Sequence, residues 1–187
     1  MDTHGEHRSS LDEHRWVNLG DPADVPGGVI AAVRAFVPLS HDAGAAAKHW
    51  LDGSLAGLSE PLDTWLCLSQ DDFLLGFVSL TQAAFTLSER DRRILEFRRT
   101  GRMTPDPQRG TMITWIARDH STARGSGRKL FRLALARAIL SDSAALIVEP
   151  HDAAAGDMWI DDYCFREFAP PTGKLWFPVG NAPQGYP

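Results

Sequence analysis

Two glycines one residue apart, Gly125 and Gly127, are the residues of this chain best suited to chemistry, and Arg128 and Lys129 follow them directly. They lie between an apolar run, 111–117, and a long segment whose apolar residues recur at helical spacing. Glycines at a helix start let the backbone turn with its N–H groups facing outward, and the helix dipole adds positive potential there. Such a turn is suited to binding a phosphate group.

Spacing separates the architectures that could use this turn. A Walker loop needs four residues between its glycines and then Lys and Ser or Thr, so it is excluded. A dinucleotide fingerprint stays open as the weaker alternative, because Glu149 lies at about the distance of a ribose-binding acid. Against it, Leu130 replaces the third glycine, and a loop over 118–124 follows the apolar run.

The third architecture is a pyrophosphate loop with the pattern Gln or Arg, two residues, Gly, one residue, and Gly or Ala. The sequence Thr122-Ala-Arg-Gly125-Ser-Gly127 matches both glycines and differs at Thr122. In this loop the chain resembles the GCN5-related N-acetyltransferase (GNAT) superfamily. The wider segment 37–179 resembles the acetyltransferase toxins of bacterial toxin–antitoxin pairs in its Trp50-Leu51 pair, its strand-like run 73–80 and its closing run 173–178.

The surrounding elements must position this turn. Periodicity predicts helices over 25–36, 42–58, 88–98, from the glycine turn to about 140, and 154–161, and strands over 65–68, 73–80, 111–117, 145–148 and 175–179, with a Gly/Pro-rich loop over 101–110. This order predicts an α/β (α+β) fold with a mixed, twisted central sheet and helices on both faces. The strand–helix–strand unit predicts a right-handed parallel crossover. The GNAT resemblance implies that its two strands splay apart, so that the arm of acyl-CoA pairs with backbone there.

Composition favours one globular domain. With 187 residues, 43% hydrophobic and 23% charged, the chain can bury a core, and we expect a single domain over 16–187 after a flexible tail over 1–15. No apolar stretch approaches the roughly 20 residues that span a bilayer, so we expect no membrane contact and a cytoplasmic protein. We interpret Cys67 and Cys164 as core thiols and expect no metal site.

The resemblance implies an N-acetyltransferase that moves an acetyl group from acetyl-CoA to a primary amine. The implied cofactor-binding residues follow the strand and the turn: Ile116, Ala117, Arg118, Ala123, Arg124, Gly125, Ser126, Gly127, Arg128 and Lys129. Related enzymes usually take the acid for the leaving thiolate from a tyrosine in the pattern Phe-Tyr, three residues, Gly-Phe. Aligned on Phe165, this chain has Ile160 at the tyrosine position and Cys164 at the glycine.

Two accounts of the missing tyrosine stay open. Either Tyr163, three residues along the same helix, supplies the phenol, or the acid is absent and the protein is a catalytically degenerate acyl-CoA-binding protein. His120, before the glycine turn, and Glu149, at a strand end, are candidate bases, and each could equally be a phosphate neighbour or a solvated polar residue.

Arginines concentrate on the predicted helix 88–98 in a chain of formal net charge -5. Arg92, Arg93, Arg98 and Arg99 are the candidate nucleic-acid contacts. The alternative is a solvated helix face with ion pairs such as Glu89 with Arg93. The resembled toxins acetylate aminoacyl-tRNA, which implies aminoacyl-tRNA as acceptor, an antitoxin protein as partner and a homodimer as an assembly to test. A small-molecule or protein amine is the alternative acceptor.

Overall fold

The computed structural model describes residues 14–20, 25–39, 42–58, 62–98, 107–122 and 126–180, with the side chains of 97 and 98 left out. Within these ranges the helices are α1 (Gly27–Ala35), α2 (Asp42–Leu55), α3 (Glu89–Arg98), α4 (Ser126–Leu140) and α5 (Ala153–Tyr163). The strands are β1 (His14–Asn18), β2 (Asp63–Ser69), β3 (Leu74–Phe85), β4 (Gln108–Arg118), β5 (Ala145–Val148), β6 (Arg166–Glu167) and β7 (Leu175–Pro178).

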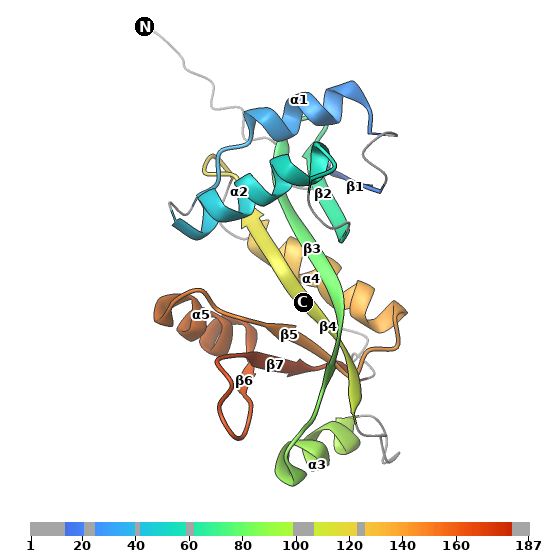
Figure 1. Cartoon of the computed structure of the whole chain (residues 1–187), viewed down its shortest axis with the longest axis vertical. Helices are drawn as coiled ribbons and strands as arrows, with labels where there is room; N and C mark the ends of the chain where they lie inside the picture. Colours follow the sequence, from blue (N-terminus) through green and yellow to red (C-terminus); the bar gives the residue numbers. More distant parts are fainter. Residues whose placement is uncertain are drawn as a thin grey trace, which may run out of the picture.

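The described strands form one mixed sheet in the order β1-β2-β3-β4-β5-β7-β6. β4 and β5 run parallel and are joined through α4, while the other neighbouring pairs are antiparallel. Side chains alternate along the strands, so that Phe77 packs with α1 and α2 while Val78 packs with α4 on the opposite face. The predicted mixed sheet with helices on both faces is therefore confirmed (Figure 1).

The parallel pair β4 and β5 separates after a short ladder. Its last partners are Ile113 and Val148, where β5 ends, whereas β4 continues for five more residues to Arg118. The extra residue Thr114 falls at a register shift between β3 and β4, at the point of separation. We call this point, together with the stretch 114–118 of β4 that no longer pairs with β5, the fork.

The loop between α1 and α2 is held against the end of β4 by Asp119. Its carboxylate accepts hydrogen bonds from the Val37 N–H at 3.0 Å, the Ser121 N–H at 2.9 Å and the Ser121 hydroxyl at 2.6 Å. The Leu39 N–H also donates to the Arg118 carbonyl at 3.0 Å. Burial disfavours the ionised form of Asp119, but these hydrogen bonds outweigh it and lower the pKa of the carboxyl below its usual 3.8.

α3 lies at the end of the long strands β3 and β4 that is remote from α1 and α2 (Figure 1). Ser88 caps it, because the Ser88 hydroxyl oxygen accepts from the Asp91 N–H at 3.2 Å. On the buried side, Leu95 packs with Trp176 and Phe85 in a separate part of the core. The charged helix that the sequence predicts therefore forms, at the opposite end of β4 from the fork.

The structure corrects several details of the sequence-based prediction. β1 begins at His14, inside the segment expected to be a tail, and residues 1–13 lie outside the described part. β4 begins at Gln108, inside the predicted Gly/Pro-rich loop, because pairing with Phe85 extends it. Cys67 is buried as expected, but Cys164 is exposed, because it ends α5 in the left-handed conformation at φ 59°.

Candidate functional site

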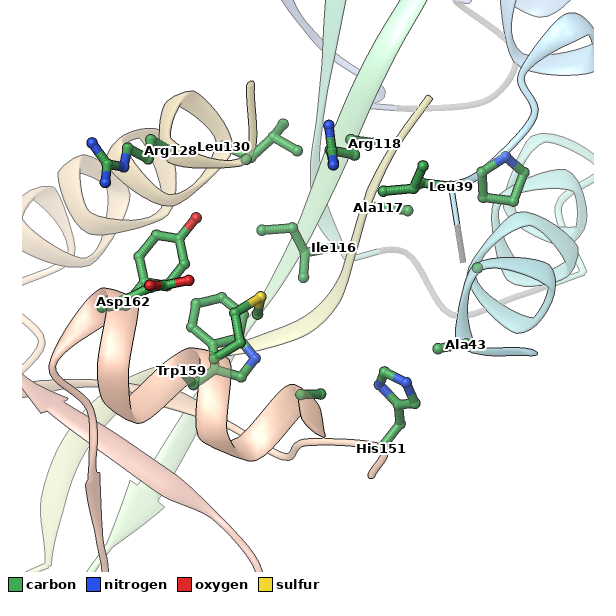
Figure 2. Close-up of a pocket in the computed structure, with 16 residues that line it drawn as sticks. Leu39, Ala43, Ile116, Ala117, Arg118, Arg128, Leu130, His151, Trp159 and Asp162 are labelled. Carbon is green, nitrogen blue, oxygen red and sulfur yellow. The ribbon is translucent and has the colours of Figure 1, made fainter. Parts of the chain in front are cut away.

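A cavity of about 710 Å³ opens beside the fork. Ile116, Ala117 and Arg118 of β4 form its floor, and the α1–α2 loop, the first turn of α2, the start of α4 and α5 form its walls (Figure 2). Its volume is in the range of small-molecule and cofactor sites. The expected splaying of β4 and β5 therefore produces a cavity, because none of the described strands pairs with the open side of β4 after Ile113.

One end of the cavity is positively charged. Arg118 and Arg128 line it beside Gly127 in the first turn of α4, with the Asp162 carboxylate near Arg128, and the N-terminal end of the helix dipole favours an anion there. Arg118 also donates to the Thr122 carbonyl at 3.3 Å. A Cβ added to Gly127 would lie 3.3 Å from the Tyr163 hydroxyl oxygen, so glycine leaves space that a larger residue would fill.

The remaining predicted cofactor residues divide into two groups. Ala123, Arg124 and Gly125 lie outside the described residues. Ser126 is buried, with its hydroxyl donating to the Thr122 hydroxyl at 3.1 Å, and Lys129 lies in a different small pocket beside His14 and Cys67. Burial raises the pKa of the Cys67 thiol to about 11, against the opposing charge of Lys129. The structure therefore does not bring Lys129 to the cavity.

Tyr163 lines the cavity, and its ring is fixed by aromatic contacts. Its centroid lies 4.9 Å from that of Phe131 and 5.0 Å from that of Trp159. Burial raises the pKa of the Tyr163 hydroxyl above its usual 10.0, although the charges of Arg128 and Arg118 act against this. The phenol therefore keeps its proton near neutral pH and can donate it.

Ile160, at the tyrosine position of the GNAT pattern, is 37% exposed and does not line the cavity. Cys164 occupies the pattern's glycine position, and its left-handed conformation is the one that favours glycine at a helix end. The left-handed backbone at Cys164 fits the glycine of the pattern, and Tyr163 lies on a different helical face from Ile160.

The two candidate bases have different surroundings. His120 is exposed, does not line the cavity, and has its Nδ1 3.3 Å from the Val37 carbonyl oxygen. Glu149 lies at the end of β5, where the Lys174 ammonium is 3.6 Å from its carboxylate. It lines a smaller cavity of about 110 Å³, at the point where β4 and β5 separate.

Sequence reasoning missed His151, which lines both cavities together with Ala43, Ile116 and Trp159. The signal was present in the four residues that follow β5, Glu149-Pro-His-Asp152, since polar residues after a parallel strand often face a ligand. In Figure 2, His151 lies beside Ala43 of α2, whereas Asp162 lies near Arg128. α5 therefore begins near the fork and ends near the positively charged end.

The candidate nucleic-acid residues lie far from this cavity. Arg92 and Arg93 belong to α3, and Arg93 forms an exposed ion pair with Glu89. The side chain of Arg98, and Arg99 as a whole, lie outside the described part of the structure. At about 3.3 Å per residue, the two ends of β4 are about 33 Å apart. The arginines and the cavity can therefore meet the same ligand only if that ligand is large.

The strand order, the parallel crossover and the fork together define the GNAT fold, as the sequence resemblance predicts. No protein-family profile and no curated sequence matches the chain. Solved structures do match. AtaT complexed with acetyl-methionyl-tRNAfMet has a TM-score of 0.63 at 15% identity, over 89% of this chain and 95% of AtaT.

Two further structures match over similar lengths. A tyrosine-to-phenylalanine mutant of the AtaT toxin, bound to the C-terminus of the antitoxin AtaR and acetyl-CoA, has a TM-score of 0.57 at 15% identity, over 90% of this chain and 94% of the toxin. A tyrosine-to-phenylalanine mutant of KacT has a TM-score of 0.62 at 14% identity, over 89% of this chain and 95% of KacT.

None of the helices in the described part of the chain has the length and apolar character needed to cross a membrane.

Proposed function

We propose that this chain is an acetyl-CoA-dependent N-acetyltransferase whose acceptor is a primary amine, with the amino acid of an aminoacyl-tRNA as the leading acceptor. The observation that carries the proposal is the fork, which opens into a cofactor-sized cavity with a positively charged end. The likeness to AtaT with acetyl-methionyl-tRNAfMet supports the choice of acceptor. It also supports a toxin role with an antitoxin partner, and an acceptor of this kind implies action in the cytoplasm.

The residues present fit an acyl-CoA. Arg118, Arg128 and the N–H groups at the start of α4 would hold the pyrophosphate, and the space beside Gly127 admits it. The open edge of β4 would pair with the pantetheine amides. The bound thioester supplies an activated acetyl group, and Tyr163 is the group that we assign as proton donor for the thiolate.

Substitution of Gly127 tests cofactor binding. Gly127→Asp places a carboxylate beside the phosphate site, and we expect at least a tenfold weaker acetyl-CoA affinity by calorimetry, about 1.4 kcal/mol. Gly27→Asp is the matched control, because a Cβ at Gly27 of α1 meets nothing within 4 Å. Unchanged affinity in folded Gly127→Asp would refute the assignment of the cavity to acetyl-CoA.

Turnover is tested separately, with labelled acetyl-CoA and bulk charged tRNA. We expect label on the aminoacyl group. If wild type binds acetyl-CoA but labels neither charged tRNA nor small amines, Ile160 marks a degenerate site, and the protein is an acyl-CoA-binding protein instead. Label on small amines alone would move the acceptor to that class.

A further inference from the structure

The connection between β5 and α5 places a histidine where the acetyl group would lie. β5 ends at Val148, directly at the fork, and His151 follows three residues later. Since the positively charged end marks the phosphates, an acyl-CoA extended along the open edge of β4 would place its thioester in the part of the cavity between Tyr163 and His151. His151 lines both the large cavity and the smaller one at the fork, and therefore lies between the two.

A carboxylate lies beside this imidazole. His151 Nε2 lies 2.9 Å from Oδ2 of Asp152. The other oxygen of Asp152, Oδ1, accepts the Ala155 N–H at 2.7 Å and caps α5, so the helix holds the carboxylate in place. A proton on Nε2 would face this carboxylate and would leave the lone pair of a neutral imidazole on Nδ1.

The other described histidines lack this combination. His14 and His49 do not line the cavity, and His120 is occupied with the α1–α2 loop. Glu149 lines the smaller cavity but has the Lys174 ammonium 3.6 Å away, which favours a solvated ion pair over proton transfer. His151 is thus the base candidate that the described residues support best.

A second observation marks the same place as a ligand site. The Thr114 hydroxyl at the fork is buried, lines the smaller cavity, and has no hydrogen-bond partner within the described residues. A buried polar group without a partner costs free energy, so it usually has a ligand or water to bond. An acyl oxygen or an acceptor group held at the fork would satisfy it.

We propose that His151 is the general base of the acyl transfer and that Asp152 is its positioning residue. This inference rests on the proposed function. His151 Nδ1 takes a proton from the acceptor amine as its nitrogen forms a bond to the thioester carbonyl carbon. The C–S bond then breaks, its electron pair leaves with sulfur, and the thiolate takes up one proton from Tyr163; solvent then takes the proton from His151 and returns one to Tyr163. The products are the N-acetylated amine and the free thiol.

The pH profile of a His151 variant depends on the titratable groups that share its surroundings. Asp152 and Glu149 belong to its own loop, whereas Arg118 of β4 and Asp162 and Tyr163 of α5 line the same cavity nearer its positively charged end. α2 presents Ala43 and Ala47 at this point. An α-amino group has a pKa near 7.7–8.0, so a base matters most at low pH, where the amine is protonated.

The test uses the full-length chain with bulk charged tRNA and labelled acetyl-CoA, at pH 6.5 and 8.5 in short incubations. For His151→Gln we expect kcat/KM to fall at least about 100-fold at pH 6.5, with a deficit about tenfold smaller at pH 8.5 and an unchanged acetyl-CoA Kd. Asp152→Asn keeps a residue that caps helices and should show the same pH-dependent deficit with an unchanged Tm. His49→Gln, at an exposed position of α2, is the control and should match wild type.

Two results would overturn the inference, and they separate failure of the His151 assignment from failure of the proposed function. If wild type is active and His151→Gln matches it at both pH values, the base lies elsewhere and the acetyltransferase assignment survives. If wild type binds acetyl-CoA but acetylates no amine, the proposed function fails and the inference fails with it. If Asp152→Asn lowers kcat/KM equally at both pH values and also lowers the Tm, Asp152 acts only as a helix cap and does not position His151.

Discussion

Tyr163 reaches the cavity because of its place on α5. Three residues along a helix correspond to a rotation of about 60° short of a full turn, so Tyr163 lies on a face of α5 next to that of Ile160, nearly one turn further along the helix. Its hydroxyl lies beside Gly127, near the phosphate end. The phenol can therefore act on the leaving group or on the phosphates, and one substitution separates these roles.

Tyr163→Phe keeps the ring contacts with Phe131 and Trp159 and removes only the hydroxyl. If Tyr163 is the acid, as we propose, kcat should fall about 10²- to 10⁴-fold while acetyl-CoA affinity stays constant in calorimetry. A weaker Kd with normal kcat would instead assign the hydroxyl to the phosphates. Phe177→Leu, in the same aromatic cluster but outside the cavity lining, controls for altered packing.

At the scale of single residues, the sequence was informative where one residue type determines the chemistry. The sequence predicts Arg118, Gly127 and Arg128 as cofactor-binding residues, because a phosphate turn needs such residue types; the structure places all three along the cavity, and their binding role stays a prediction. His151 was missed although polar residues after β5 were a signal, because its place between two cavities depends on α2 and α5, whose packing here the sequence does not show.

Among the elements, the α1–α2 loop depends on one ionised side chain. One carboxylate oxygen of Asp119 accepts from the Val37 N–H, and the other accepts from Ser121. Asp119→Asn replaces one of these oxygens with an amide N–H₂ group, which cannot accept a hydrogen bond. At pH 7 we expect the free energy of unfolding to fall by about 2 kcal/mol, the size of a charged hydrogen bond. Denaturant unfolding measures this difference.

The pH dependence of that difference follows from the lowered pKa of Asp119. Because the folded pKa lies below the unfolded one, the stabilisation is fully present above the unfolded pKa and is lost as pH falls through the folded pKa. The gap between wild type and Asp119→Asn should therefore close below about pH 3.8. Asp72→Asn, at an exposed ion pair, should change stability by less than about 1 kcal/mol. A gap that stays constant down to pH 3 would contradict this account.

Elements with their own pattern were predicted well. β5 was predicted to the residue, because a run of four apolar residues ends at Glu149-Pro150. β1 was missed, because the sequence His-Arg-Trp-Val-Asn has no clear strand pattern and becomes a strand only by pairing with β2. The exposure of Cys164 was missed because the chain reverses there, which residue type alone did not indicate.

At the scale of the whole molecule, the distance between α3 and the cavity limits which ligands could contact both the α3 arginines and the cavity. A ligand that contacts both must reach along most of β4, about 26 Å from Gln108 to Ile116, which a tRNA can do and a small amine cannot. Ion pairing also weakens the case, because Glu89 already neutralises Arg93. The arginines on α3 therefore provide a test of acceptor size.

The double variant Arg92→Glu and Arg93→Glu should reduce acetylation of charged tRNA and leave acetylation of a small amine and acetyl-CoA binding unchanged. If both residues contact phosphates, the plot of log affinity for tRNA against log salt concentration should become shallower by about 1 to 2. Arg34→Glu, in the last turn of α1, provides a matched charge reversal on another surface. An unchanged salt slope would make the α3 arginines an ordinary solvated helix face.

The five residues of β4 beyond Ile113 give the sheet an open edge in its interior rather than at its border. Border edges risk recruiting other chains, but this edge is enclosed between helices, so only a slender extended ligand can reach it. Its backbone amides that point away from β3 lack a strand partner, and we expect them to exchange their hydrogens with solvent faster than the amides of 110–113. A ligand that pairs along this edge would slow that exchange at alternate residues, and the pattern of protection would map the ligand's path through the sheet.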